Sequence, residues 1–146
     1  MELLKKEKIK YIIVHHSERD VDSPEFIKER HIKNRNFKDI GYHFLIGNGE
    51  MGTTKGKLYL GRDTKFWGAH AYGYNDKSIG ICLVGNFDKK KPSEKQIKKL
   101  INFLKEKMSE YNIPKENVLG HRELPNSEKT CPGKNIDMNE VRNLLY

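Results

Sequence analysis

The sequence predicts one α/β domain, residues 1–146, in which a central mixed β-sheet is flanked by α-helices. Its 146 residues are enough for a single domain with its own hydrophobic core. Short apolar runs alternate along the chain with segments of helical periodicity, which is the pattern of an α/β sheet. A glycine-rich stretch at 47–57 separates two further apolar runs, which indicates a hairpin and therefore a mixed sheet.

Five strands are predicted from short runs rich in Ile, Leu and Val. The fourth run, SIGICLVGNF, is apolar over most of its length, so we expect it at the centre of the sheet with both faces buried. The predicted strands are, in chain order, residues 10–16, 41–47, 58–62, 78–87 and 116–121.

Three helices are predicted from capping residues and apolar spacing. Ser23 can cap the first helix, and a proline follows it at the first helical position. Ser93 and Gln96 fit a capping box at the start of the second, where apolar residues recur on one helical face. Asp137 begins the third, with Glu140 as its candidate capping partner. The predicted helices are residues 23–35, 93–111 and 137–146.

Composition and charge narrow the functional classes. No apolar run approaches the roughly 18 residues of a membrane span, and the N-terminus lacks the apolar core of a signal peptide. We therefore expect a soluble chain that is cytoplasmic as synthesised, enters no membrane and begins with a basic tail at 1–9. The net charge of +8 favours a polyanionic partner. The lysines match no nucleic-acid-binding motif, so nucleic acid is not the expected partner, and a solvated lysine surface is the simplest interpretation.

Two histidines and a cysteine lie at the ends of predicted strands or just beyond them. His15 is near the end of the first strand, His121 closes the last, and Cys131 follows ten residues later. Strand ends bring distant segments to one edge of a sheet, and two imidazoles with one thiolate would leave the fourth position of a catalytic zinc open. None of the three forms a local pair such as H-x-x-x-H or C-x-x-C. From spacing alone, therefore, an alternative stays open in which Cys131 is a small loop residue and the histidines are surface polar groups.

Six motifs in a fixed order favour the metal interpretation. They are IIVHHS (12–17), GYHFLI (41–46), LGRD (60–63), GAHAYGYNDKSIGICLVGNF (68–87), GHRE (120–123) and KTCPG (129–133). Together they strongly resemble the zinc-dependent N-acetylmuramoyl-L-alanine amidase family, which includes small phage lysozymes that are amidases, cell-wall recycling amidases and animal peptidoglycan-recognition proteins. The resemblance runs from Tyr11 to the C-terminus and implies the fold of that family. The stretch 47–57 belongs to a connection longer than the family's usual turn. It could shape the substrate cleft or be a tolerated surface insertion, and we favour the insertion.

The resemblance assigns roles residue by residue. The ligands for Zn²⁺ fall on three residues, which are His15, His121 and Cys131. The family's catalytic tyrosine and lysine fall on Tyr42 and Lys129, which are expected to stabilise the oxyanion. Either of the two can relay the proton that the leaving amine needs. His70 of GAHA matches a histidine at the rim of the family's cleft and is the candidate substrate contact.

Three neighbouring residues are expected to have structural roles. Because side chains alternate along a strand, His16 should point to the opposite face from His15, and His43 should point away from Tyr42. Cys82 lies inside a predicted strand between apolar neighbours, where a buried and inert thiol is expected.

The resemblance implies an enzyme that hydrolyses the amide bond between N-acetylmuramic acid and L-alanine in bacterial peptidoglycan. The expected role is that of a phage or prophage endolysin, which acts on the cell wall after its release. The alternatives are a cytosolic recycling amidase and a peptidoglycan-binding protein without hydrolytic activity. The presence of the thiolate ligand Cys131 favours hydrolysis over binding alone. Some small phage amidases also bind a phage RNA polymerase, and this sequence shows no feature that indicates such a surface.

Overall fold

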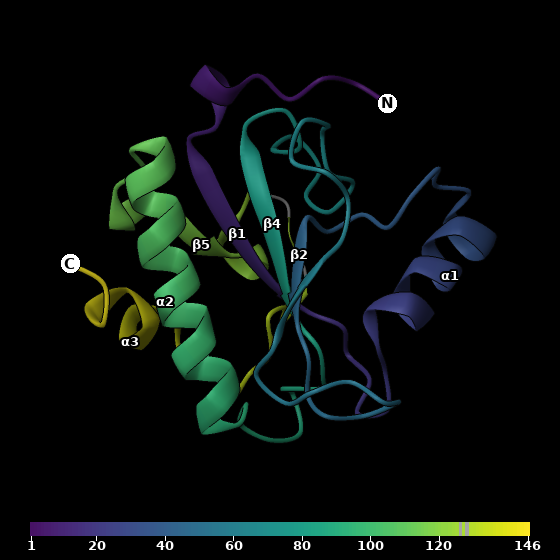
Figure 1. Ribbon diagram of the computed structural model, residues 1–146. Helices are drawn as coiled ribbons and strands as arrows, with labels where there is room; N and C mark the ends of the chain where they lie inside the picture. The colour runs from purple at the N-terminus through teal and green to yellow at the C-terminus, as the bar shows by residue number, and fades with distance from the viewer. Residues whose placement is uncertain (126, 128) are drawn as a thin grey trace.

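The computed structural model describes residues 1–125, 127 and 129–146, and Figure 1 shows a sheet with helices on both sides. The strand order in the sheet is β3-β2-β4-β1-β5. The strands are β1 (Tyr11–His16), β2 (Phe44–Ile46), β3 (Leu58–Leu60), β4 (Ser78–Leu83) and β5 (Val118–Gly120). The helices are α1 (Pro24–Arg35), α2 (Glu94–Tyr111) and α3 (Met138–Asn143), with short 3-10 turns η1 (Lys6–Lys8), η2 (Lys115–Asn117) and η3 (His121–Glu123).

The sheet is mixed, which confirms the predicted fold class. β1 pairs in parallel with β4 and β5, and β2 pairs in parallel with β4. β2 and β3 form the predicted antiparallel hairpin. β4 is the central strand, and all of its residues are buried. It ends at Leu83 and not at residue 87, because Gly85 takes a positive φ of 139° that turns the chain out of the sheet.

Alternation of side chains divides the sheet into two faces. On one face, Ile and Val residues of β1, β4 and β5 pack against α2 and α3 in the main hydrophobic core. On the other face, His15, Cys82 and Leu45 lie side by side in register, and Ile27 of α1 joins their apolar cluster. Figure 1 shows α1 and α2 on opposite sides of the sheet. His15 therefore faces the side of α1, and His16 faces the other side.

The predicted caps are largely confirmed. The Ser23 hydroxyl accepts from the backbone N–H of Phe26 at 3.1 Å at the start of α1. At the start of α2, Ser93 and Gln96 form the complete capping box. Asp137 caps α3 by accepting from two backbone N–H groups, one of which belongs to Glu140. Glu140 was predicted to complete a capping box with its side chain, but in the cap of α3 only its backbone N–H takes part. Among the described helices, none combines the length and apolar character needed to cross a membrane.

The N-terminal segment is docked on the domain. Leu3 forms an isolated β-bridge with Phe66, and the backbone N–H of Leu4 donates to the carbonyl oxygen of Lys65 at 2.8 Å. The side chains of Leu4 and Ile9 belong to the main core. The expected basic tail is therefore held in place, because two aliphatic side chains are buried while the charged residues between them stay exposed to solvent.

The 47–57 connection is a hydrogen-bonded loop that packs on α2. The amide of Gly56 donates to the carbonyl oxygen of Gly47 at 2.9 Å. Gly56 has a φ of +79°, and a Cβ atom at this position would lie 2.8 Å from the Cβ of Lys95. The loop lines a shallow surface groove together with α2, and none of its residues, all of which the structure describes, lines the cleft described below.

A core substitution tests how strongly α2 holds the sheet. Leu104 is fully buried in the main core, so Leu104→Ala is expected to lower the free energy of unfolding by about 2–5 kcal/mol. Urea unfolding of both proteins measures the difference. Glu106→Ala changes an exposed residue of the same helix and should stay within about 0.5 kcal/mol of the parent. Equal losses for the two variants would show that α2 does not contribute to the core in this way.

Candidate functional site

A cleft of about 470 Å³ opens on the face of the sheet that α1 covers. Residues of β1, α1 and the loops before β2 and after β5 line it. It contains all six of the residues that the sequence singled out, which are His15, Tyr42, His70, His121, Lys129 and Cys131. Segments up to 116 positions apart in the chain therefore meet at one place.

His15 is the centre of this group. It lies one residue before the end of β1, and only 1% of it is exposed. Its ring centroid lies 4.7 Å from that of His121, 4.9 Å from that of His70 and 5.0 Å from that of Tyr42. β1 pairs with β4 along one edge and with β5 along the other. These two pairings hold its backbone, and therefore His15, in place.

The structure places His15, His121 and Cys131 so that they can share a metal ion. One ligand atom from each of the three lies within 4.8 Å of the others, and the Nδ1 of His15 lies 3.7 Å from the Sγ of Cys131. The backbone N–H of His16 donates to the same sulfur at 3.4 Å. This hydrogen bond stabilises negative charge on the sulfur, which is the form that binds a metal.

Arg122 holds the loop that carries Cys131. Its backbone N–H donates to the carbonyl oxygen of Cys131 at 2.8 Å. Its guanidinium donates to three further backbone carbonyl oxygens, those of Thr130, Gly133 and Ile136. Arg122 directly follows a candidate ligand, so one short segment carries one ligand and positions another. Sequence analysis did not assign this role, and the arginine of the GHRE motif was the available signal.

Glu123 anchors the same segment to α3. Its carboxylate accepts from the backbone N–H of Gly120 at 2.9 Å and pairs with Arg142 through two contacts of 2.8 Å. A bidentate pair of this kind fixes orientation as well as position. The turn that presents His121 is therefore held from both sides.

The Cys131 loop is also fastened from the side of β4. His16, Glu18 and Asp88 form a second group of potential ligands whose atoms lie within 4.8 Å of one another. Both carboxylate oxygens of Asp88 already accept hydrogen bonds from the loop, one from the hydroxyl of Thr130 and one from the N–H of Lys134, each at 2.9 Å. We therefore interpret Asp88 as an anchor for the Cys131 loop and not as a metal ligand.

Burial favours the neutral form of three histidines in the cleft, His15, His70 and His121. Burial, reinforced by neighbouring imidazoles, holds the pKa values of His15 and His70 well below the ordinary value. Burial also lowers the pKa of His121. A neutral imidazole keeps the lone pair that binds a metal. Burial raises the pKa of the Cys131 thiol to about 12, so a cation that binds here must displace its proton.

Tyr42 and Lys129 supply donors to the same cleft. Tyr42 is partly buried against the apolar cluster of the α1 face, and burial raises its pKa well above the ordinary value. It is therefore a neutral phenol that can donate a hydrogen bond. Lys129 is exposed and lines the cleft from the loop before Cys131.

His70 lines the cleft, but other residues of the protein occupy both of its ring nitrogens. Its Nδ1 lies 2.8 Å from the Nε2 of His15, and its Nε2 lies 3.3 Å from the hydroxyl of Ser78. This arrangement leaves no ring nitrogen for a hydrogen bond to a substrate. His70 lines the cleft, and the substrate contact expected for it stays a prediction.

The other residues expected to be structural are buried in the domain. His43 accepts from the backbone N–H of Gly80 through Nδ1 at 3.1 Å, and its Nε2 donates to the carbonyl oxygen of Phe66 at 2.9 Å. His16 accepts from the backbone N–H of Phe87 at 3.1 Å, and Cys82 is fully buried in β4.

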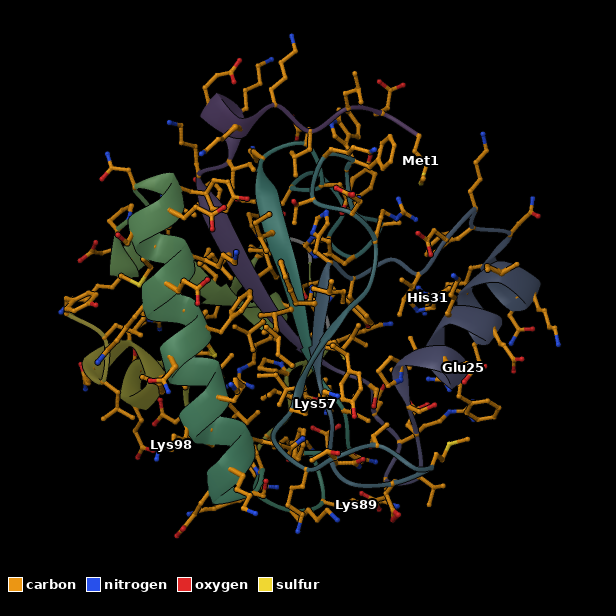
Figure 2. All side chains as sticks on the ribbon, in the orientation of Figure 1. Met1, Glu25, His31, Lys57, Lys89 and Lys98 are labelled. Carbon is orange, nitrogen blue, oxygen red and sulfur yellow. The ribbon has the colours of Figure 1, made fainter. Side chains whose placement is uncertain are left out.

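Sequence analysis did not assign the wall of the cleft that α1 forms. Four polar residues of α1 and one from the loop before it line this wall, which are Arg30, His31, Asn34, Arg35 and Arg19. Figure 2 shows His31 on the side of α1 that faces the sheet. Arg30 is held by two contacts of 2.8 Å to the buried carboxylate of Asp22. The signal in the sequence was the helical spacing of polar residues 30, 31, 34 and 35 in a helix with few apolar residues.

Comparison with known proteins identifies a family. Residues 5–134 match the family described as N-acetylmuramoyl-L-alanine amidase. A peptidoglycan recognition protein of Trichoplusia ni is 37% identical over 117 residues, which cover 80% of this chain and 59% of that protein. Peptidoglycan-recognition protein SC2 of Drosophila melanogaster is 34% identical over 143 residues, covering 92% of this chain and 73% of that protein. The chain thus spans roughly three fifths to three quarters of these relatives.

Solved structures show the same arrangement of elements. The N-acetylmuramoyl-L-alanine amidase LysC from Clostridium intestinale superposes with a TM-score of 0.83 at 30% identity, covering 96% of this chain and 87% of that one. Apis mellifera PGRP-SA superposes with a TM-score of 0.80 at 30% identity, covering 98% of this chain and 86% of that one. The fold is therefore shared with both groups.

Proposed function

Because this chain belongs to the N-acetylmuramoyl-L-alanine amidase family, we propose that it is a zinc-dependent peptidoglycan hydrolase. It hydrolyses the amide bond that joins N-acetylmuramic acid to the L-alanine of the stem peptide. The observation that carries this proposal is the convergence of a His-His-Cys ligand group with a tyrosine and a lysine in one cleft. Residues 1–146 act as one amidase domain in this proposal, and the biological role is that of a phage or prophage endolysin.

The ligand group fits Zn²⁺. A tetrahedral zinc with bonds of about 2.0 Å to nitrogen and 2.3 Å to sulfur places these two atoms about 3.5 Å apart. The separation here between the His15 nitrogen and the Cys131 sulfur is 3.7 Å. Two imidazoles and a thiolate are ligands that zinc prefers, and three protein ligands are typical of a catalytic site. When bound, zinc lowers the pKa of a coordinated water and polarises a carbonyl group.

Tyr42 and Lys129 then act on the substrate. As water adds to the amide carbon, the carbonyl oxygen gains negative charge, and the Tyr42 hydroxyl and the Lys129 ammonium donate to it. One such donor is typically worth about 2.7–4 kcal/mol in the transition state. The carbon–nitrogen bond breaks when the leaving amine receives a proton. Tyr42 and Lys129 are the candidate relays, and the raised pKa of Tyr42 keeps its proton in place until the substrate takes it.

The charge of the cleft suits an acidic substrate. Arg19 and Arg35 line it from α1 and the loop before α1, and Lys129 lines it from the loop that carries Cys131. Carboxylates of a stem peptide would find cationic partners on both of these segments. This distribution supports peptidoglycan as the partner.

A second candidate function is binding of peptidoglycan without hydrolysis, since relatives of this chain are named as recognition proteins. The presence of Cys131 in the ligand group favours hydrolysis. A third candidate, cytosolic recycling of soluble wall fragments, uses the same site and differs in the physical form of the substrate.

Product analysis tests the proposed activity. The zinc-loaded chain is incubated with purified sacculi and, separately, with a soluble muramoyl-peptide. Mass spectrometry should detect peptides with a new L-alanine amino terminus and no new reducing sugar ends. Binding to sacculi without any such product would support the recognition function, and cleavage of the soluble substrate alone would support recycling.

Salt dependence tests whether the positive surface directs the enzyme to the wall. Lys55, Lys95, Lys98 and Lys99 line the groove between the inserted loop and α2, and Figure 2 shows Lys89 and Lys98 at the periphery of the molecule. Cleavage of sacculi should fall as NaCl rises from 0.1 to 1 M, since the Debye length shrinks from about 10 Å to about 3 Å. Cleavage of the soluble muramoyl-peptide should change far less. Parallel loss of both activities would show that the positive charge does not direct the enzyme to the wall, and that the lysines form a solvated surface.

A further inference from the structure

We propose that His70 and Ser78 are positioning residues that fix His15 in the tautomer whose Nδ1 lone pair points at the metal. This inference rests on the metal site proposed above. It goes beyond that site because it assigns a direction to each hydrogen bond behind the ligand. It also gives His70 a role that acts through His15.

The direction of the hydrogen bonds is set at Ser78. Its hydroxyl lies 2.6 Å from the backbone carbonyl oxygen of Tyr74, and a carbonyl oxygen can only accept. The hydroxyl therefore donates to Tyr74, and its single hydrogen is used. Its oxygen can then only accept from the Nε2 of His70, which lies 3.3 Å away.

The same reasoning continues through the two rings. A neutral imidazole carries one N–H group, and in His70 this group is on Nε2. The Nδ1 of His70 is therefore an acceptor, and the Nε2–H of His15 donates to it across 2.8 Å. The hydrogen of His15 is then on Nε2, so its Nδ1 keeps a free lone pair. That atom is the one that lies 3.7 Å from the sulfur of Cys131.

Packing keeps the His70 ring in the orientation that this chain of hydrogen bonds needs. The ring lies against Gly80 of β4, where a Cβ atom would come within 2.7–2.8 Å of three of its ring atoms. The absence of a side chain at Gly80 makes this close approach possible. The backbone N–H groups of His70 and Ala71 both donate to the side-chain oxygen of Asn75 at 3.0 Å, which fixes the loop.

Residues behind a metal-bound histidine commonly fix its tautomer and ring orientation, and their loss typically weakens metal binding by about 10–100-fold. Two variants of similar size separate this effect from packing. Asparagine at position 70 retains an acceptor near the place of Nδ1, whereas leucine has none. We expect His70→Leu to weaken zinc binding about 10–100-fold and His70→Asn to recover most of that loss. Ser78→Ala removes the acceptor for His70 and should weaken zinc binding in the same direction.

The test has two readouts that do not depend on hydrolysis. Competition with a chelator gives the zinc dissociation constant of the parent and of each variant, with circular dichroism to check folding. Long-range ¹H–¹⁵N NMR of the full chain before zinc is added reports which nitrogen of His15 carries the proton when no metal dictates it, and the proton is expected on Nε2.

Three results would overturn the inference. They are a proton on Nδ1 of His15, equal zinc dissociation constants for the leucine and asparagine variants, and a parent chain that binds no zinc. If a position-70 variant does not fold, the parent spectrum still decides the question, and a parental zinc dissociation constant in Ser78→Ala would contradict the inference. A parent that binds zinc with the expected tautomer but cleaves no peptidoglycan would refute the proposed enzyme while leaving this inference standing.

Discussion

Cys131→Ser is expected to remove most of the zinc from the purified protein and to lower amidase activity by more than about 100-fold. Loss of a residue that only supports a ligand costs about 10–100-fold, and loss of a ligand should exceed this range. The serine hydroxyl does not ionise near neutral pH, so the site would lose its anionic ligand. Elemental analysis of the variant and the parent, prepared side by side, measures the zinc content.

Cys82→Ala provides the control for this experiment. Cys82 is the other cysteine of the chain, and its thiol is buried in β4 outside the His-His-Cys group. This variant should keep its zinc. The Cys131→Ser protein should keep its helical circular dichroism, because the main core lies on the opposite face of the sheet from His15 and needs no metal. Full zinc occupancy in Cys131→Ser would exclude the thiolate from the ligand set.

Tyr42→Phe and Lys129→Ala are each expected to lower kcat by about 10²–10³ while zinc content stays at the parental level. Each variant removes one donor to the oxygen that gains charge in the transition state, and neither removes a metal ligand. Because the contact forms fully only in the transition state, the loss should appear in kcat more than in KM. Kinetics on the soluble muramoyl-peptide, with zinc analysis of the same preparations, measures both quantities.

Two matched variants show whether these losses are specific. Tyr72 is 95% exposed and outside the cleft, so Tyr72→Phe should retain parental kcat. Lys134 lies in the loop that carries Cys131 but does not line the cleft, so Lys134→Ala should do the same. Parental turnover in both Tyr42→Phe and Lys129→Ala would show that the metal and its water act without these donors.

The elements that sequence analysis located well are those whose signals are local. The capping box of Ser93 and Gln96 and the apolar face of α2 involve residues within a few positions of one another. The ends of strands were less predictable. The run 78–87 is apolar beyond Leu83, yet the strand stops there because the chain turns at Gly85. The docking of Leu4 depends on the 65–67 segment and on the main core, which no local pattern encodes.

The sequence by itself determined the element types, the mixed sheet and the order of motifs that pointed to the ligand group. Only the tertiary structure decided how these residues are held. Arg122 fastens the Cys131 loop, and α1 supplies a cationic wall. His15 contacts His70, which is 55 positions away in the sequence, and lies beside Cys131, which is 116 positions away. Periodicity and capping report interactions within a few residues, whereas hydrogen-bond direction depends on which atoms from distant segments come within about 3 Å of each other.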